Sequence, residues 1–164
     1  LVSARALDAM QQAGCVGIQL GVESGSNRLL KAMRKGFGIE EALDACRLIR
    51  QRGLRLECFF MVGMPQEDER SLALTLRTIE ELDCDKIIYS IFTPYPGTAA
   101  FDYCWRLGLI GPGYAPSLHN HQSPANDFCP RIGQKRFRQL AAQVERAVEI
   151  KNAGARARAA WPEP

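Results

Sequence analysis

Gly21-Val22-Glu23-Ser24-Gly25-Ser26 is the stretch that decides the fold, because it places a carboxylate and a glycine/serine turn where an apolar strand passes into a helix. Two further strands also end in turn-forming residues. Residues 59–62 run into Gly63-Met64-Pro65-Gln66-Glu67, and residues 87–92 run into Thr93-Pro94-Tyr95-Pro96-Gly97-Thr98. In an α/β fold the carboxyl ends of parallel strands share one rim. The sequence therefore predicts a binding rim built from three strand ends.

Helical and strand patterns alternate on either side of these junctions. Apolar residues recur at i, i+3, i+4 and i+7 in the helical segments, and the strands are short apolar runs that end at glycine or proline. The order demands parallel strands joined by right-handed crossovers. The expected helices are 4–13 with Ser3 as cap, 26–33 capped by Ser26, 39–52, one that follows Asp68, and 99–107; the expected strands are 15–22, 54–62 and 86–93.

Three parallel strands are too few to close a barrel, and a sheet this small leaves its edges unpaired. We therefore expect an α/β fold that is the second half of a partial (β/α) barrel, spanning residues 1–110. Residues 111–164 form an irregular extension and a terminal helix, expected over 134–152 with a frayed tail. Because the chain starts at Leu1 directly in a helical pattern, we expect a fragment whose partner is the upstream half of the same enzyme.

The composition of the chain argues against several classes of function. A formal charge of +3, from 21 basic and 18 acidic residues, is too mild to predict a nucleic-acid partner. No signal peptide or membrane-length apolar run is visible. The six cysteines form no closely spaced pair, which argues against zinc and iron-sulfur ligation and favours a reduced, cytoplasmic protein.

Strand alternation places Gln19, Gly21 and Glu23 on one face of the first strand. That face points into the partial barrel, with Glu23 at its mouth and Gly21 leaving room for a ligand. A carboxylate suits hydroxyl or ammonium groups, because it only accepts hydrogen bonds when ionised. The alternative is that Glu23, Ser24 and Ser26 satisfy the amides of the following helix.

The stretches GVESGSNRLLKAMRKG (21–36), FFMVGMPQED (59–68) and IFTPYPGT (91–98) resemble the C-terminal half of a radical S-adenosylmethionine (SAM) enzyme core. They are most similar to proteins that carry a cobalamin-binding domain upstream. The resemblance covers roughly residues 14 to 110. The family's CxxxCxxC cluster loop is absent from this sequence.

The resemblance implies that this half binds the nucleotide side of SAM. Gln19, Gly21, Glu23 and Ser24 match positions at the ribose or methionine part, and Met61, Val62 and Gly63 match the adenine pocket. The backbone of Thr93 and Pro94 would bond the adenine edge, with Tyr95 beside it. It also implies that the iron-sulfur cluster, and cobalamin where present, come from upstream sequence. We therefore expect the isolated chain to be inactive and to hold no cluster.

Other interpretations stay open at this point. The second interpretation is a small α/β module that binds a nucleotide or phosphate at the glycine/serine junctions without catalysis. A hydrolase fits less well, since Ser24 lies three residues after Gly21 and GxSxG needs two. His119-Asn120-His121 with Cys104 or Cys129 is a weak metal pattern, because no pair has zinc-site spacing. The segment SLHNHQSPANDF resembles the covering region after the radical SAM core.

Overall fold

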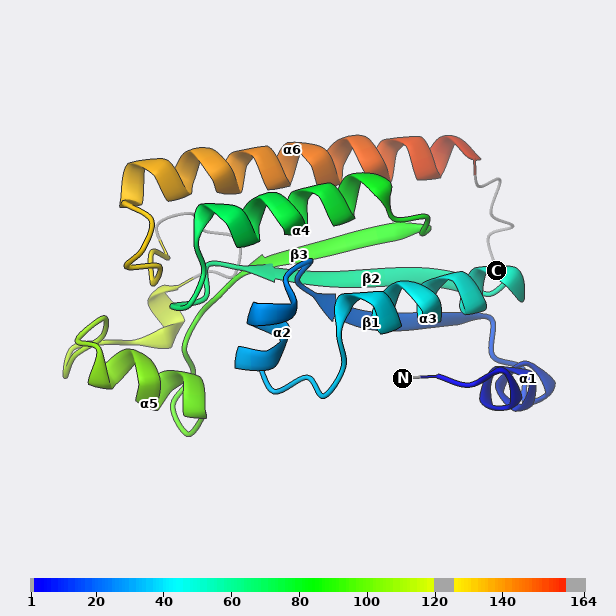
Figure 1. Cartoon of the computed structure of the whole chain (residues 1–164), viewed down its shortest axis with the longest axis horizontal. Helices are drawn as coiled ribbons and strands as arrows, with labels where there is room; N and C mark the ends of the chain where they lie inside the picture. Colours follow the sequence, from blue (N-terminus) through cyan, green and yellow to red (C-terminus); the bar gives the residue numbers. More distant parts are fainter. Residues whose placement is uncertain (1, 120–125, 159–164) are drawn as a thin grey trace.

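A computed structural model describes residues 2–119 and 126–158 of the chain. Its centre is a sheet of three parallel strands in the order β1-β2-β3, and the carboxyl ends of the strands point toward the side of α2 (Asn27–Ala32) and α5 (Ala99–Arg106) (Figure 1). The strands are β1 (Gly17–Glu23), β2 (Arg55–Val62) and β3 (Lys86–Ile91). The predicted α/β fold with three parallel strands is confirmed.

Helices α3 (Ile39–Gln51), α4 (Glu69–Glu81) and α6 (Gln134–Arg158) cover one face of the sheet, whereas α2 and α5 lie near the carboxyl ends of the strands (Figure 1). Helix α3 contacts β1 and β2, while α6 packs on both β3 and α4. These contacts bury alternate strand residues in one core, among them Leu56, Phe60 and Ile87. The remaining helix of the described residues is α1 (Ala4–Gln12), with a short 3₁₀ turn η1 (Pro116–Leu118) after α5.

The opposite face of the sheet stays partly exposed in the described residues. Gly21 pairs with Phe59 and Met61 pairs with Ser90, and these open-face positions are of intermediate burial. This is the face that the alternation of Gln19, Gly21 and Glu23 predicted, and Leu20 and Val22 on the other side are buried as expected. The half barrel thus has a covered outside and an open inside.

A second, smaller cluster lies at the carboxyl rim, apart from the main core. Phe92, which follows β3, packs there with Met64, Cys104 and Phe128. The cluster joins α5 and the irregular segment to the ends of β2 and β3. The extension after residue 110 is thereby attached to the rim.

The terminal helix differs from the sequence-based expectation. We predicted an end near residue 152 and a frayed tail, but α6 continues to Arg158. The Ala/Arg-rich composition explains this, because both residues have high helix propensity. No helix among the described residues is long and apolar enough to cross a membrane.

Candidate functional site at the carboxyl rim

The first junction ends in an unusual backbone conformation. Glu23 has φ 68°, in the left-handed region that side chains other than glycine rarely adopt, and the pairing of β1 with β2 shifts register between Gly21 and Glu23. A Cβ at position 21 would lie 2.5 Å from Glu23 Oε1, so a larger residue would displace that carboxylate. Gly21 therefore lets Glu23 turn back over the open face.

Glu23 forms an ion pair with a residue that the sequence-based analysis did not name. Lys35 Nζ donates to Glu23 Oε1 at 3.0 Å, and the two side chains are 27% and 23% exposed. Lys35 also lies 5.6 Å from the centroid of the Phe37 ring. The pair presents one positive and one negative group, both partly accessible, beside the end of β1. The sequence could have pointed to Lys35, because this residue lies in the AMRKG part of the motif quoted above.

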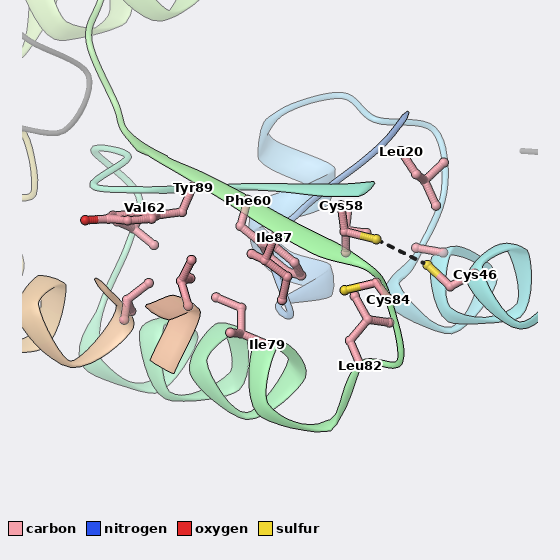
Figure 2. Packing of buried hydrophobic residues seen from close by; sticks show 14 of the residues in the cluster. Leu20, Cys46, Cys58, Phe60, Val62, Ile79, Leu82, Cys84, Ile87 and Tyr89 are labelled. Atoms are coloured by element: carbon pink, nitrogen blue, oxygen red, sulfur yellow. Dashed lines mark hydrogen bonds between the residues drawn. The ribbon is translucent and has the colours of Figure 1, made fainter. Parts of the chain in front are cut away.

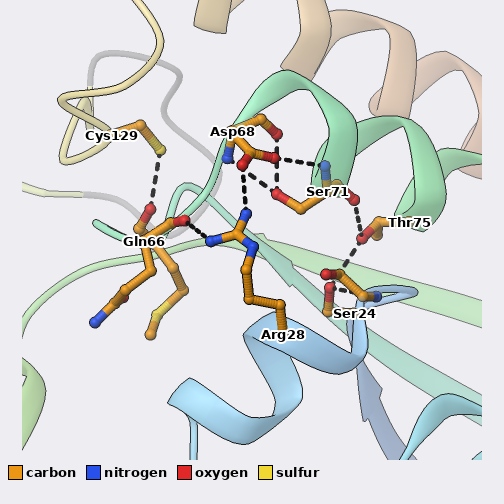
Figure 3. Close-up of polar contacts among 9 residues, drawn as sticks. Ser24, Arg28, Gln66, Asp68, Ser71, Thr75 and Cys129 are labelled. Carbon is orange, nitrogen blue, oxygen red and sulfur yellow. Dashed lines mark hydrogen bonds and ion pairs between the residues drawn. The ribbon is translucent and has the colours of Figure 1, made fainter.

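Ser24 faces inward rather than toward the open face. It is fully buried, and its hydroxyl lies 3.1 Å from Thr75 Oγ1 on α4 (Figure 3). The same Thr75 oxygen accepts from the Gly25 amide, and Ser24 Oγ accepts from the Ser26 amide, each at 3.1 Å. The expected capping of α2 by the Ser26 side chain is wrong, since that side chain makes no cap hydrogen bond.

Helix α4 lies directly against this turn. A Cβ at Gly25 would fall 2.4 Å from the carbonyl oxygen of Leu74, so only glycine fits. The start of α4 then reaches the second junction: Asp68 is its N-cap, and Arg28 on α2 donates to Asp68 and to the Gln66 carbonyl, both at 2.6 Å (Figure 3). The predicted Asp68 cap is confirmed. One polar network therefore fixes the first two junctions to each other.

The second junction turns at Gly63, which has φ 95° and is buried. Its amide donates to Glu67 Oε2, whereas Glu67 Oε1 has no partner in the part of the chain that the structure describes. Burial raises the pKa of Glu67 to about 7, against the opposing effect of the Gly63 and Met64 amides. Of the residues predicted for this junction, Met61 is partly exposed on the open face, and Val62 is fully buried beneath it.

The third junction is held by the extension. Asn126 Nδ2 donates to Thr93 Oγ1 at 3.0 Å, and Asn126 Oδ1 lies 2.9 Å from His119 Nδ1. Both Thr93 and Asn126 are buried. A buried carboxamide between two polar side chains is satisfied locally, which accounts for its position in an otherwise apolar cluster.

Aromatic rings complete this side of the rim. Tyr114 donates its hydroxyl to the Pro94 carbonyl at 2.9 Å, and its ring centroid lies 4.9 Å from that of His119 and 6.1 Å from that of Phe128. Tyr95 projects outward and is 43% exposed. The predicted covering segment thus contacts the third junction.

The structure brings most of the predicted site residues to one rim but not all. Gln19 lies further back on β1, where its Nε2 donates to Glu57 Oε2 at 2.9 Å. A cavity of about 420 Å³ lies beside these two residues, toward the amino ends of β1 and β2. Asn120 and His121 of the weak metal pattern lie outside the described residues. Among residues 2–119 and 126–158 no group of three or more His, Cys, Asp or Glu side chains is arranged to hold a metal ion.

Part of the chain matches a known protein family. Residues 1–79 match the sequence model of the Radical SAM superfamily. This range contains the first two junctions, Glu23, Lys35 and Glu67. The third junction and the extension follow it.

Curated relatives and a solved structure are also similar. An uncharacterized methyltransferase of Pyrococcus horikoshii is 34% identical over 102 residues, which cover 62% of this chain and 22% of that protein. A tRNA-2-methylthio-N(6)-dimethylallyladenosine synthase of Aromatoleum aromaticum is 36% identical over 87 residues, 52% of this chain and 20% of that protein. The chain spans about a fifth of the length of these relatives. The structure of Methanocaldococcus infernus Elp3 with an N-terminal deletion has a TM-score of 0.57 at 24% identity, covering 65% of this chain and 25% of that one, and supports the fold.

Proposed function

From the radical SAM superfamily domain that residues 1–79 match, we propose that this chain supplies the nucleotide side of the S-adenosylmethionine site in a radical SAM enzyme. The observation that carries the proposal is the Glu23–Lys35 pair at the open end of β1. SAM bears an α-ammonium and a carboxylate on its methionine part and hydroxyls on its ribose. A partly exposed pair of opposite charges matches both sets of groups.

The residues at the rim fit this ligand by their geometry. The Glu23 carboxylate and the Lys35 ammonium fill the space above Gly21, so a ligand at this end of β1 meets that ion pair directly. Lys35 contacts Glu23 Oε1, and we assign Glu23 Oε2 to a hydroxyl or ammonium group of the ligand. We assign Met61 to the adenine face and the backbone of Gly63, Thr93 and Pro94 to the adenine edge. Ser24 and Val62, which are fully buried, act here by positioning Glu23 and Gly63. When bound, SAM supplies the carbon–sulfur bond that radical chemistry breaks.

The iron-sulfur cluster requires thiolates gathered at one point, and the six cysteines of this sequence do not have that spacing. We propose that cluster ligands come from another part of the enzyme. The named relatives carry methyltransferase and methylthiolation names, and neither name refers to cobalamin. A cobalamin domain therefore has no support from them, and the proposal rests on SAM alone.

Replacing Glu23 tests this function. In the full-length protein, Glu23→Ala should weaken SAM binding about tenfold to a hundredfold, because a charge-assisted hydrogen bond contributes roughly 1.5 to 3 kcal/mol. Glu23→Gln keeps one acceptor oxygen and should lose less. Calorimetry measures the affinity, and iron content checks that the cluster is retained. Asp44→Ala, at an exposed carboxylate on α3, is the matched control. Unchanged affinity in both Glu23 variants would reduce Glu23 to a structural partner of Lys35.

A further inference from the structure

Three of the six cysteines meet in the main core, on the side of the sheet away from the rim residues. Cys46 comes from α3, Cys58 from β2 and Cys84 from the loop between α4 and β3 (Figure 2). The Sγ atoms of Cys46 and Cys58 lie 3.9 Å apart, and Cys84 is buried beside Cys58 (Figure 2). All three are free thiols in this structure. The residues lie far apart in sequence, so only the packing of α3 against β2 creates the cluster.

Buried cysteines usually act as small apolar side chains, and two further features distinguish this group. The first is a cavity of about 490 Å³ whose wall includes Cys46, together with Arg47 and Arg50. Cys46 itself is only 2% exposed, so an entering molecule meets a small part of the sulfur. A small, uncharged molecule is the reagent that such an opening admits.

The second feature is the uneven chemistry of the thiols. The hydrogen bond from Cys58 lowers the pKa of Cys46 against the effect of burial, and the charge of Arg47 lowers it further. Bonds to Cys46 and Cys84 raise the pKa of Cys58. The pKa values of Cys46 and Cys84 are both lowered, so a thiolate forms more readily on either of them than on Cys58, and Cys46 is the one that borders the cavity. A thiolate with an adjacent thiol is the arrangement of a reactive and a resolving cysteine.

We propose that Cys46 and Cys58 form an oxidant-responsive dithiol pair that hydrogen peroxide converts to a disulfide. The Cys46 thiolate attacks one peroxide oxygen, the O–O bond breaks and hydroxide leaves, which gives a sulfenic acid on Cys46. The sulfur of Cys58 then attacks Cys46 Sγ, the S–O bond breaks, and the proton of Cys58 leaves with the hydroxide as water. The hydroxide released in the first step takes up the proton that Cys46 lost on ionising. The products are therefore one disulfide and two molecules of water, and the two sulfurs together lose two electrons.

Forming this bond requires the two sulfurs to move toward each other. A disulfide places its sulfurs about 2.05 Å apart, so the two must approach by about 2 Å. Cys84 also lies beside Cys58 and is the alternative partner (Figure 2). The bond would tie α3 to β2, the strand that leads into Gly63 on the rim.

Peptide mapping tests the proposal directly. The reduced full-length protein is exposed to hydrogen peroxide without oxygen, its remaining thiols are alkylated, and it is digested with trypsin under non-reducing conditions. Cleavage after Lys and Arg places Cys46, Cys58 and Cys84 on separate peptides, 36–47, 56–70 and 78–86. We expect a 36–47/56–70 pair that lacks the mass of two hydrogen atoms and disappears on reduction.

Variants identify the partners. Cys46→Ser should abolish the pair, whereas Cys15→Ser, at a cysteine near the start of β1, should leave its yield unchanged. Wild-type protein alone already decides the main point if Cys46→Ser fails to fold. A predominant 56–70/78–86 pair would overturn the assignment to Cys46. All three core thiols recovered in alkylated form, while peroxide oxidises the Cys15 peptide, would overturn the proposal as a whole.

Discussion

The first and third junctions hold the same rim by different means. At the first, Ser24 and Gly25 are bonded to Thr75, deep in α4, by a buried polar network. At the third, Pro94 and Thr93 are held by side chains of a segment that follows α5, through Tyr114 and Asn126. The first is built from the repeated α/β units themselves. The third depends on the extension that follows α5. One side of the rim is therefore fixed by buried hydrogen bonds between the α/β units, and the shape of the other side depends on the extension.

The largest expected effect on stability comes from Glu67 at the second junction, which Arg28 joins to the first junction through Asp68 and Gln66. Glu67 has a usual pKa of 4.5 that burial raises to about 7, so its ionisation opposes folding. The stabilisation that comes from keeping Glu67 protonated in the folded state is fully present below about pH 4.5 and is lost as pH rises through 7. The loss amounts to about 3 kcal/mol. The variant Glu67→Gln cannot ionise, so its stability should not show this loss as the pH rises.

The measurement is urea unfolding of wild type and Glu67→Gln from pH 4 to 8. Subtracting one curve from the other cancels the other titrating groups. We expect the wild type to lose stability relative to the variant across this window. A difference that stays constant with pH would mean that Glu67 is ionised at no cost, and that the second junction is not rigidly closed.

A smaller effect is expected from Thr75→Val, which keeps the shape of the side chain and removes its hydroxyl. The Gly25 amide and the Ser24 hydroxyl then lose their common partner inside the core, which costs about 2 kcal/mol. Thr78→Val is the matched control, since the Thr78 hydroxyl donates to the Leu74 carbonyl at a more exposed site one turn away and, among the described residues, has no hydrogen bond to Ser24 or Gly25. Equal losses in the two variants would contradict the network described for the first junction.

The smallest effect is expected from Tyr114→Phe at the third junction. The ring packing remains and one partly buried hydrogen bond to Pro94 is lost, so stability should fall by about 1 kcal/mol or less. Hydrogen exchange should quicken at the Thr98 amide and remain slow at Gly25. If exchange quickens equally at both amides, the two junctions are one cooperative unit and the contrast between them fails.

The sequence predicted the fold because its signals are local. Period-two alternation placed Gln19, Gly21 and Glu23 on one face, and the glycines and prolines marked each strand end. The caps at Ser3 and Asp68 follow from oxygen side chains that precede a helix by one residue. The expected end of the last helix was wrong, because alanine and arginine continued it beyond residue 152.

The pairing of distant residues came only from the tertiary structure. Ser24 meets Thr75 across 51 positions, and Asn126 meets Thr93 across 33. Nothing local in the sequence distinguishes Thr75 from Thr78, which lie three residues apart on the same side of α4, and only the packing of the Gly25 turn decides which hydroxyl it bonds. The inward position of Ser24, the Glu23–Lys35 pair and the cysteine cluster were missed for the same reason. Periodicity determines which face of an element is buried, whereas the packing of one element on another decides which residues meet there.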